Sequence, residues 1–174
     1  IGIQAALRQR DLTGEGAHID MALLDTQVSV LANQAMNYLV SGKAPRRLGN
    51  AHPNIVPYQV FPVADGHVVI AVGNDGQFKR LCQILDCSAL ADDPLYATNP
   101  ARVKNRVVLC EKIAELTSTL ARHDLLTALE KAGVPAGPIN TVADVFADPQ
   151  VHARGMKVDL DNADALLGHV PSVR

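Results

Sequence analysis

The chain has 174 residues, of which 48% are hydrophobic and 20% are charged. This composition is typical of a globular protein, and the length suits one domain, or one domain with a piece of another. The net charge of −2 excludes a strong basic field for binding nucleic acid or an anionic membrane. No apolar run approaches the roughly 20 residues that a membrane-spanning helix needs. We therefore expect no nucleic acid and no membrane among the partners.

The cysteines and histidines argue against a metal site. Cys82, Cys87 and Cys110 are odd in number and lack a C-x-x-C spacing, and the six histidines form no H-x-x-x-H pair. Unpaired cysteines in apolar helical patterns are typical of a reducing compartment. We expect a cytoplasmic protein, or a mitochondrial or peroxisomal one if the source is eukaryotic.

Both ends of the chain lie within regular patterns. The segment Ile1–Arg8 reads as the middle of a helix, and Val170–Arg174 reads as a strand without a terminator. We therefore expect a fragment of a longer protein, in which other residues contribute to function.

The first 40 residues predict a helix–strand–helix remnant of a larger domain. Apolar spacing predicts a helix over 1–10, and the Thr13-Gly14-Glu15-Gly16 turn ends it. Polar and apolar residues alternate over 18–22, as in a half-buried strand. Apolar residues then recur at helical spacing over 23–40, which predicts one long, buried helix.

Residues 41–57 predict a polar, proline-rich linker. Within it, Arg46 and Arg47 are adjacent cations that suit bidentate contacts to a phosphate or carboxylate. The alternative is a solvated pair of linker charges.

The end of this linker is the most informative part of the chain. Prolines and asparagines prevent a regular helix or a central strand there, and a rigid loop anchored on a strand is a usual place for ligand contacts. The ring of Pro53 favours extended geometry for His52, which can then donate a hydrogen bond to a carbonyl or carboxylate. A solvated loop histidine in a plain connector is the alternative. The candidate ligand residues are Gly49, Asn50, His52, Pro53, Asn54 and Tyr58.

Residues 58–160 predict a small α+β domain with a β-hairpin and several helices. The runs 58–63 and 67–72 are strand-like, and Ala64-Asp65-Gly66 joins them as a hairpin turn. The remaining elements are a helix from an Asn74 cap (paired with Gln77) to Leu85, a helix from an Asn99-Pro100 cap to Leu120, a helix over 123–131 closed by Gly133, a short helix capped by Thr141 with Asp144, and a strand over 156–160. Residues 161–174 are expected to return toward the larger domain.

The chain has no G-x-S-x-G elbow, phosphate loop or G-x-G-x-x-G turn. Asp20 and Asp25 are five residues apart, and capping or local hydrogen bonding is the preferred explanation for Asp25. Capping is also preferred for Asn74 and Asp75, with a ligand contact at the carboxyl end of a strand as the alternative. Residue patterns alone therefore indicate an α+β unit with a candidate ligand loop, without naming its chemistry.

Several short motifs occur together in one order. They are Thr13-Gly14-Glu15-Gly16 with His18 to Asp25, Gly49-Asn50-Ala51-His52-Pro53 with Pro57-Tyr58, Asp65-Gly66 through Phe78, Asn99 with Arg102 and Asn105-Arg106, and Gly133 to Asn140. In this combination the chain resembles family III CoA-transferases, the CaiB/BaiF and formyl-CoA transferase group.

The resemblance implies an enzyme that moves CoA from an acyl-CoA to a carboxylic acid, here a dicarboxylic acid. In this family an aspartate forms a mixed anhydride and then an aspartyl-CoA thioester. That aspartate is expected before Ile1, so the resemblance implies no catalytic residue in this chain and no activity of the fragment alone. It implies no permanently bound cofactor and no metal, since the CoA thioester is a substrate.

The resemblance also implies supporting roles. The loop from Gly49 to Tyr58 corresponds to a lid over the active site, glycine-rich in formyl-CoA transferase and carrying His-Pro here. Leu23 corresponds to a position near the CoA thiol, and Arg46 and Arg47 are grouped with it as CoA-proximal. Family members form interlocked homodimers. The alternatives are a racemase-like superfamily member acting on acyl-CoA and a non-catalytic module for dimerisation or ligand binding.

Overall fold

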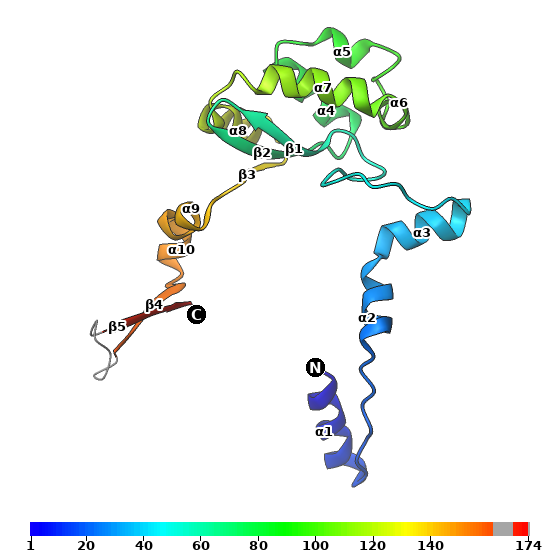
Figure 1. The fold of residues 1–174 in the computed structure, drawn as a ribbon, viewed down its shortest axis with the longest axis vertical. Coiled ribbons are helices and arrows are strands. Elements are labelled where there is room, and N and C mark those ends of the chain that lie inside the picture. Colours follow the sequence, from blue (N-terminus) through cyan, green and yellow to red (C-terminus); the bar gives the residue numbers. More distant parts are fainter. Residues whose placement is uncertain (162–168, 174) are drawn as a thin grey trace. The chain divides into compact units, whose positions relative to one another are not determined.

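The structure is a computed structural model that describes residues 1–161 and 169–173. The chain divides into two compact units, residues 1–48 and residues 49–174. Figure 1 shows the helices and strands of both units along the chain. No helix among the described residues has the length and apolar character needed to cross a bilayer.

The first unit consists of helices and extended chain. Helix α1 (Gly2–Thr13) ends at Gly14, whose φ of 78° is the left-handed conformation that glycine adopts without strain. Residues 17–22 are extended but form no strand, so the predicted strand over 18–22 is wrong. Alternation alone does not make a strand, because its N–H and C=O groups need a neighbouring strand to bind.

The predicted helix over 23–40 is divided in two. Helices α2 (Leu23–Val30) and α3 (Ala32–Ser41) meet at Ala32, whose φ of 43° interrupts the helical hydrogen bonding. The hydroxyls of Thr26 and Ser29 also bond back to main-chain carbonyls four residues earlier, a pattern that weakens helices. The prediction of one long helix is therefore wrong. Neither helix contains a residue that is buried within this chain, so burial of this segment against a partner stays a prediction.

The second unit contains the predicted hairpin. Strands β1 (Tyr58–Val63) and β2 (Gly66–Ala71) pair antiparallel, and the two-residue turn Ala64-Asp65 joins them. A third strand, β3 (Ala136–Pro138), pairs antiparallel with β2 and gives the order β1-β2-β3. The sequence did not predict β3, because Ala-Gly-Pro has neither β-branched residues nor apolar alternation.

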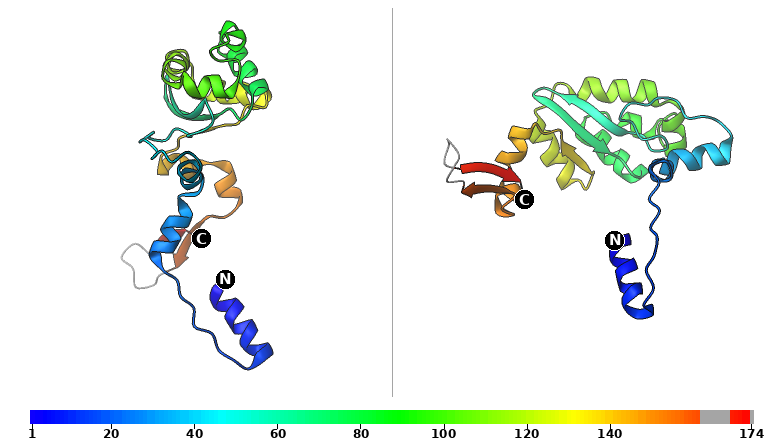
Figure 2. Two further views of the ribbon diagram at one scale, coloured as in Figure 1. Left: turned by 90° about the vertical axis from the view of Figure 1, so that its right-hand side faces the viewer. Right: turned by 60° about the horizontal axis from the view of Figure 1, so that its bottom comes forward.

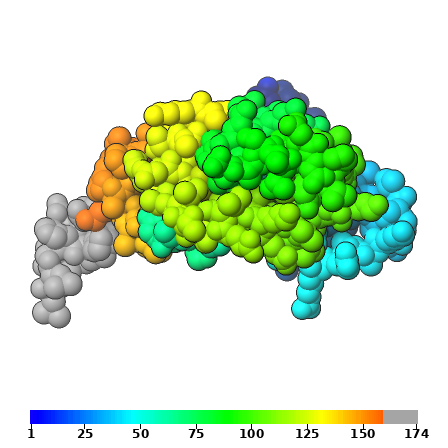
Figure 3. All heavy atoms as spheres, turned by 90° about the horizontal axis from the view of Figure 1, so that it is seen from above, coloured from blue at the N-terminus to red at the C-terminus, as the bar shows by residue number. Residues whose placement is uncertain are grey.

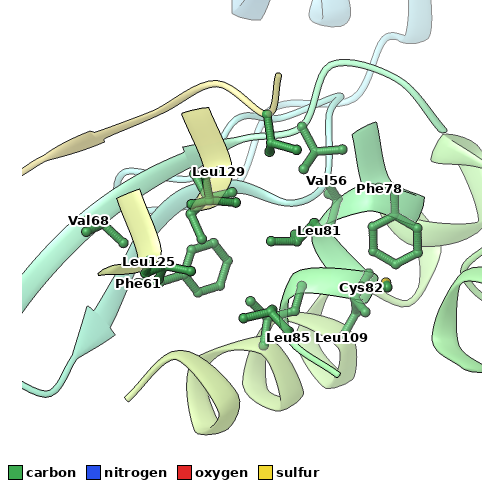
Figure 4. Close-up of a cluster of buried hydrophobic side chains, with 14 of the residues drawn as sticks. Val56, Phe61, Val68, Phe78, Leu81, Cys82, Leu85, Leu109, Leu125 and Leu129 are labelled. Atoms are coloured by element: carbon green, nitrogen blue, oxygen red, sulfur yellow. The ribbon is translucent and has the colours of Figure 1, made fainter. Parts of the chain in front are cut away.

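Helices enclose the core together with this sheet. They are α4 (Asp75–Ile84), α5 (Ala89–Asp92), α6 (Asn99–Lys104), α7 (Arg106–Thr117) and α8 (Arg122–Lys131). Alternate strand residues, including Phe61 and Val68, turn inward and meet Leu81, Leu125 and Leu129 from the helices (Figure 4). In the space-filling view, the green and yellow spheres of α5 to α8 form one closely packed surface (Figure 3).

Two helix starts differ in detail from prediction. Asn74 caps α4 by accepting from the N–H of Gln77, as predicted, but Gln77 Oε1 accepts from Gly73 rather than from Asn74. Thr98, not Asn99, caps α6. The predicted helix over 99–120 is also interrupted at Asn105, whose side-chain amide donates to carbonyls at Leu95 and Ala101.

The C-terminal part begins with two short helices. Helix α9 (Val142–Ala147) has the predicted capping box of Thr141 and Asp144, and α10 (Pro149–Ala153) is capped by Asp148. Strands β4 (Lys157–Asp161) and β5 (His169–Val173) then pair antiparallel, as the views of Figure 2 also show. The expected return segment over 161–174 lies partly outside the described residues.

Candidate functional site

The candidate loop closes on itself at its base. Gly49 has a φ of 60°, which suits glycine at the start of the turn. Asn50 Oδ1 accepts a hydrogen bond of 3.0 Å from the N–H of Val60, and the N–H of His52 donates to the carbonyl of Tyr58 over 2.9 Å. The predicted candidates from Gly49 to Tyr58 therefore form one local structure within the second unit.

His52 is held in a defined orientation inside this loop. Its Nδ1 accepts a 3.1 Å hydrogen bond from the N–H of Asn54, and its ring stacks on Tyr58 with centroids 5.2 Å apart and planes 7° from parallel. Because Nδ1 accepts, the proton of the neutral imidazole lies on Nε2. The half-buried His52 can therefore donate from Nε2 to a ligand oxygen.

Side chains from α6 and α7 bind the main chain of the loop. Asn99 Nδ2 donates to the carbonyl of Asn54 over 2.8 Å, and its Oδ1 accepts from the N–H of Val56 over 3.1 Å. Arg106 Nη1 donates to the carbonyl of His52 over 3.2 Å, and Nη2 donates to the carbonyl of Pro53. Side chains of α6 and α7 thus fix the path of the loop main chain.

Arg102 is central to this arrangement, although it was named only among the family motifs and not predicted as a site residue. It is fully buried, and its Nε, Nη1 and Nη2 donate to the carbonyl of Val56 (2.6 Å), the carbonyl of Tyr96 (2.9 Å) and Asp75 Oδ1 (2.7 Å). Its guanidinium also lies over the ring of Phe78, 4.5 Å from the centroid. Asp75 therefore has two roles. It lies in the first turn of α4, as expected, and it also forms an ion pair with Arg102.

A signal for these partners exists in the sequence. Asn99, Arg102 and Arg106 are spaced by three and four residues, the spacing that places side chains on one helix face. The spacing alone does not show that this face binds the loop, because the polar face of an amphipathic helix is usually solvated.

The other predicted site residues belong to the first unit. Leu23 begins α2 and is 85% exposed, and Arg46 and Arg47 are exposed in the chain that follows α3. The structure thus assigns the loop candidates to one unit and these three residues to the other.

The cysteines are free thiols with different environments. A hydrogen bond between Cys82 and Cys87 raises the pKa of Cys82, which burial raises further, and lowers the pKa of Cys87. Burial raises the pKa of Cys110 to about 11. Among the described residues, no group of three or more His, Cys, Asp or Glu side chains is arranged to hold a metal ion.

The full length of the chain, residues 1–174, matches CoA-transferase family III. The chain belongs to this family. The resemblance drawn from the motifs is therefore confirmed.

Curated members of family III share high identity with this chain. The succinate–glutarate CoA-transferase of Agrobacterium fabrum is 59% identical over 172 residues, which cover 99% of this chain and 42% of that protein. The human succinyl-CoA:glutarate CoA-transferase is 42% identical over 160 residues, which cover 92% of this chain and 36% of that protein. The chain thus spans less than half the length of the relatives it matches.

Solved structures confirm the α+β fold of family III. A CaiB/BaiF family protein from Brucella suis is 58% identical, with a TM-score of 0.76 over 99% of this chain and 44% of that one. Rv3272 from Mycobacterium tuberculosis is 21% identical with a TM-score of 0.79, again over 99% of this chain and 44% of that one, and this likeness concerns the fold alone.

Proposed function

We propose that this chain forms part of a CoA-transferase that moves CoA from succinyl-CoA to a dicarboxylic acid. The observation that carries the proposal is the 59% identity, over 99% of the chain, with the succinate–glutarate CoA-transferase of Agrobacterium fabrum. A succinyl-CoA:mesaconate CoA-transferase of Haloarcula hispanica, 41% identical over 165 residues, supports a dicarboxylate acceptor.

The chemistry we propose is covalent catalysis by an aspartate outside this chain. The aspartate attacks the acyl carbon of the donor and releases CoA thiolate, which leaves a mixed anhydride. The thiolate then attacks the aspartyl carbon and releases the donor acid, which leaves an aspartyl-CoA thioester. The acceptor carboxylate repeats these two steps in reverse. CoA enters as a substrate, so the reaction needs no resident cofactor.

The loop from Gly49 to Tyr58 is the part of this chain that we place at the reaction. An anhydride is readily hydrolysed, so a loop that excludes water favours transfer over hydrolysis. The fixed Nε2–H of His52 suits a hydrogen bond to a carboxylate or anhydride oxygen. Contacts within the chain set the orientation of this ring, which reduces the ordering needed on binding.

The first unit supplies the remaining proposed contacts. Arg46 and Arg47 carry exposed guanidinium groups that suit the phosphates of CoA, and Leu23 is placed near its thiol end. Large exposed apolar side chains along α1 to α3, including Ile3, Leu24 and Leu39, suit burial in an interlocked homodimer.

The three free cysteines fit a reducing compartment, and we propose the cytoplasm.

A chimera tests the transfer reaction. The matching 172 residues of the Agrobacterium fabrum enzyme are replaced by this chain, and CoA transfer from succinyl-CoA to glutarate is followed by chromatography. We expect transfer at a rate within about tenfold of the parent enzyme, because the exchanged part is closely similar. The isolated 174 residues are expected to transfer none. A chimera that is folded by circular dichroism but transfers no CoA would contradict the proposal.

His52→Ala in the same chimera tests the role of the loop. We expect kcat to fall by about tenfold or more, and hydrolysis of succinyl-CoA to rise relative to transfer, because a hydrogen-bond donor and part of the water barrier are lost. Lys104→Ala, an exposed change on α6, is the matched control. Unchanged turnover together with unchanged hydrolysis would remove His52 from the mechanism.

A further inference from the structure

Arg106 binds the candidate loop only through its main chain. Two of its guanidinium nitrogens donate to the carbonyls of His52 and Pro53, 54 and 53 residues away in sequence, and Nε donates to the carbonyl of Val103 on the preceding helix α6. A charged donor makes stronger hydrogen bonds than a neutral one, and the planar guanidinium fixes two acceptors at once. Arg106 is therefore built to set the path of the peptides on either side of Pro53.

We propose that Arg106 is a positioning residue that fixes His52 for the transfer step. This inference rests on the proposed function of the chain. It deepens that function by naming the side chain through which the scaffold controls the loop. Arg106 acts through His52 and contacts no reacting atom in this scheme.

The hydrogen bonds around His52 explain why Arg106 holds this part of the loop through the carbonyls of His52 and Pro53. The N–H of His52 is bound to Tyr58, and its Nδ1 is bound to the N–H of Asn54. Pro53 has no N–H, so between His52 and Asn54 the chain can be held only through its carbonyls. Arg106 takes both of them, which leaves Nε2 of His52 as the polar atom directed to a ligand.

Asn99, Arg102 and Arg106 together form a clamp on the main chain of the loop, and the first two bind it at other residues than Arg106 does. Arg102 is fully buried and joins Val56, Tyr96 and Asp75, so it supports the core. Asn99 holds Asn54 and Val56, the residues beyond Pro53. Arg106 is only partly buried, and of the three it is the one that binds the peptide group of His52.

Amide hydrogen exchange, measured by NMR on the whole 174-residue chain, tests the anchoring. For Arg106→Ala we expect the His52 and Asn54 amides to exchange about tenfold faster or more, because the loop opens locally. The Val56 amide, held by Asn99, and the Ile70 amide in β2 are expected to keep the rates of the unaltered chain. Lys104→Ala on α6 is the matched cation control. If Arg106→Ala does not fold, Arg106→Gln, which keeps an amide donor, takes its place.

Kinetics in the chimera test the catalytic consequence. For Arg106→Ala we expect kcat/KM for glutarate to fall by about 10- to 100-fold, since misplacing a reacting group by about 1 Å costs this much. KM for succinyl-CoA is expected to stay within about twofold, whereas general loss of structure would affect both substrates. Arg106→Lys keeps the charge and a donor, and we expect it to recover most of the loss.

The outcomes separate the two proposals. Unchanged exchange at His52 and Asn54 overturns the anchoring, and faster exchange with unchanged kinetics overturns the positioning role. If the chimera with Arg106 intact transfers no CoA, the proposed function fails and the catalytic role of Arg106 fails with it. The exchange rates still decide, in that case, whether Arg106 holds the loop.

Discussion

At the scale of single residues, Arg102 does most to join separate parts of the second unit. A buried guanidinium is costly unless each of its N–H directions is satisfied. Here the carbonyls of Val56 and Tyr96 and the carboxylate of Asp75 satisfy three directions, and the ring of Phe78 covers one face. One side chain thereby connects the loop, the α5–α6 connection and the start of α4.

Arg102→Ala is expected to destabilise the chain by about 3–5 kcal/mol, because two buried carbonyls lose their donor and a cavity remains. Asp75→Asn is expected to cost less, about 1 kcal/mol, because the Asp75 side chain is 51% exposed and water replaces part of the ion pair. Urea unfolding followed by circular dichroism measures both. A loss below about 1 kcal/mol for Arg102→Ala would contradict this account.

At the scale of elements, local signals were sufficient where one short segment decides the structure. The hairpin of β1 and β2 follows from Ala64-Asp65-Gly66 between two β-branched runs. The capping box of Thr141 and Asp144 starts α9, and Gly133, with a φ of 65°, follows α8. In each case the residues that signal the structure also make its hydrogen bonds.

Prediction failed where distant residues or the main chain decide. Strand β3 exists because Gly137 pairs with Val69, 68 positions earlier, and its own residues carry no strand signal. Helices α6 and α7 separate at Asn105 because its side-chain amide bonds to the carbonyl of Leu95. Residues 18–22 have the alternation of a strand without a partner strand, so the pattern was misleading there.

The candidate site was predicted in part for the same reason. The prolines and His52 mark the loop within ten residues of sequence, so it was found. Asn99 and Arg106 lie 43 to 54 residues away and contact main-chain atoms, which the loop sequence does not report. Their helical spacing and their place among the family motifs indicate them, but neither signal names the loop as their partner.

At the scale of the whole molecule, the hydrophobic core belongs to one unit. The buried core residues run from Val56 to Val134, whereas α1, α2 and α3 contain none. Because burial of apolar surface is the main source of stability, the free energy of unfolding should come almost entirely from residues 49 onward.

Deletion of residues 1–48 tests this division. We expect the thermal midpoint of the shortened chain to lie within about 3 °C of the full chain, because no buried contact is removed. Differential scanning calorimetry measures the midpoint and the unfolding enthalpy. Loss of the cooperative transition on deletion would mean that the first unit contributes to the core.

The clamp has a consequence for evolution. Asn99, Arg102 and Arg106 bind peptide groups of the loop, which every sequence possesses, so the side chain of a residue such as Ile55 can change while the loop keeps its path. Relatives of this chain are named as CoA-transferases for glutarate, mesaconate and oxalate. A library randomised at these loop positions, with the clamp untouched, is where a changed acceptor preference should be sought first.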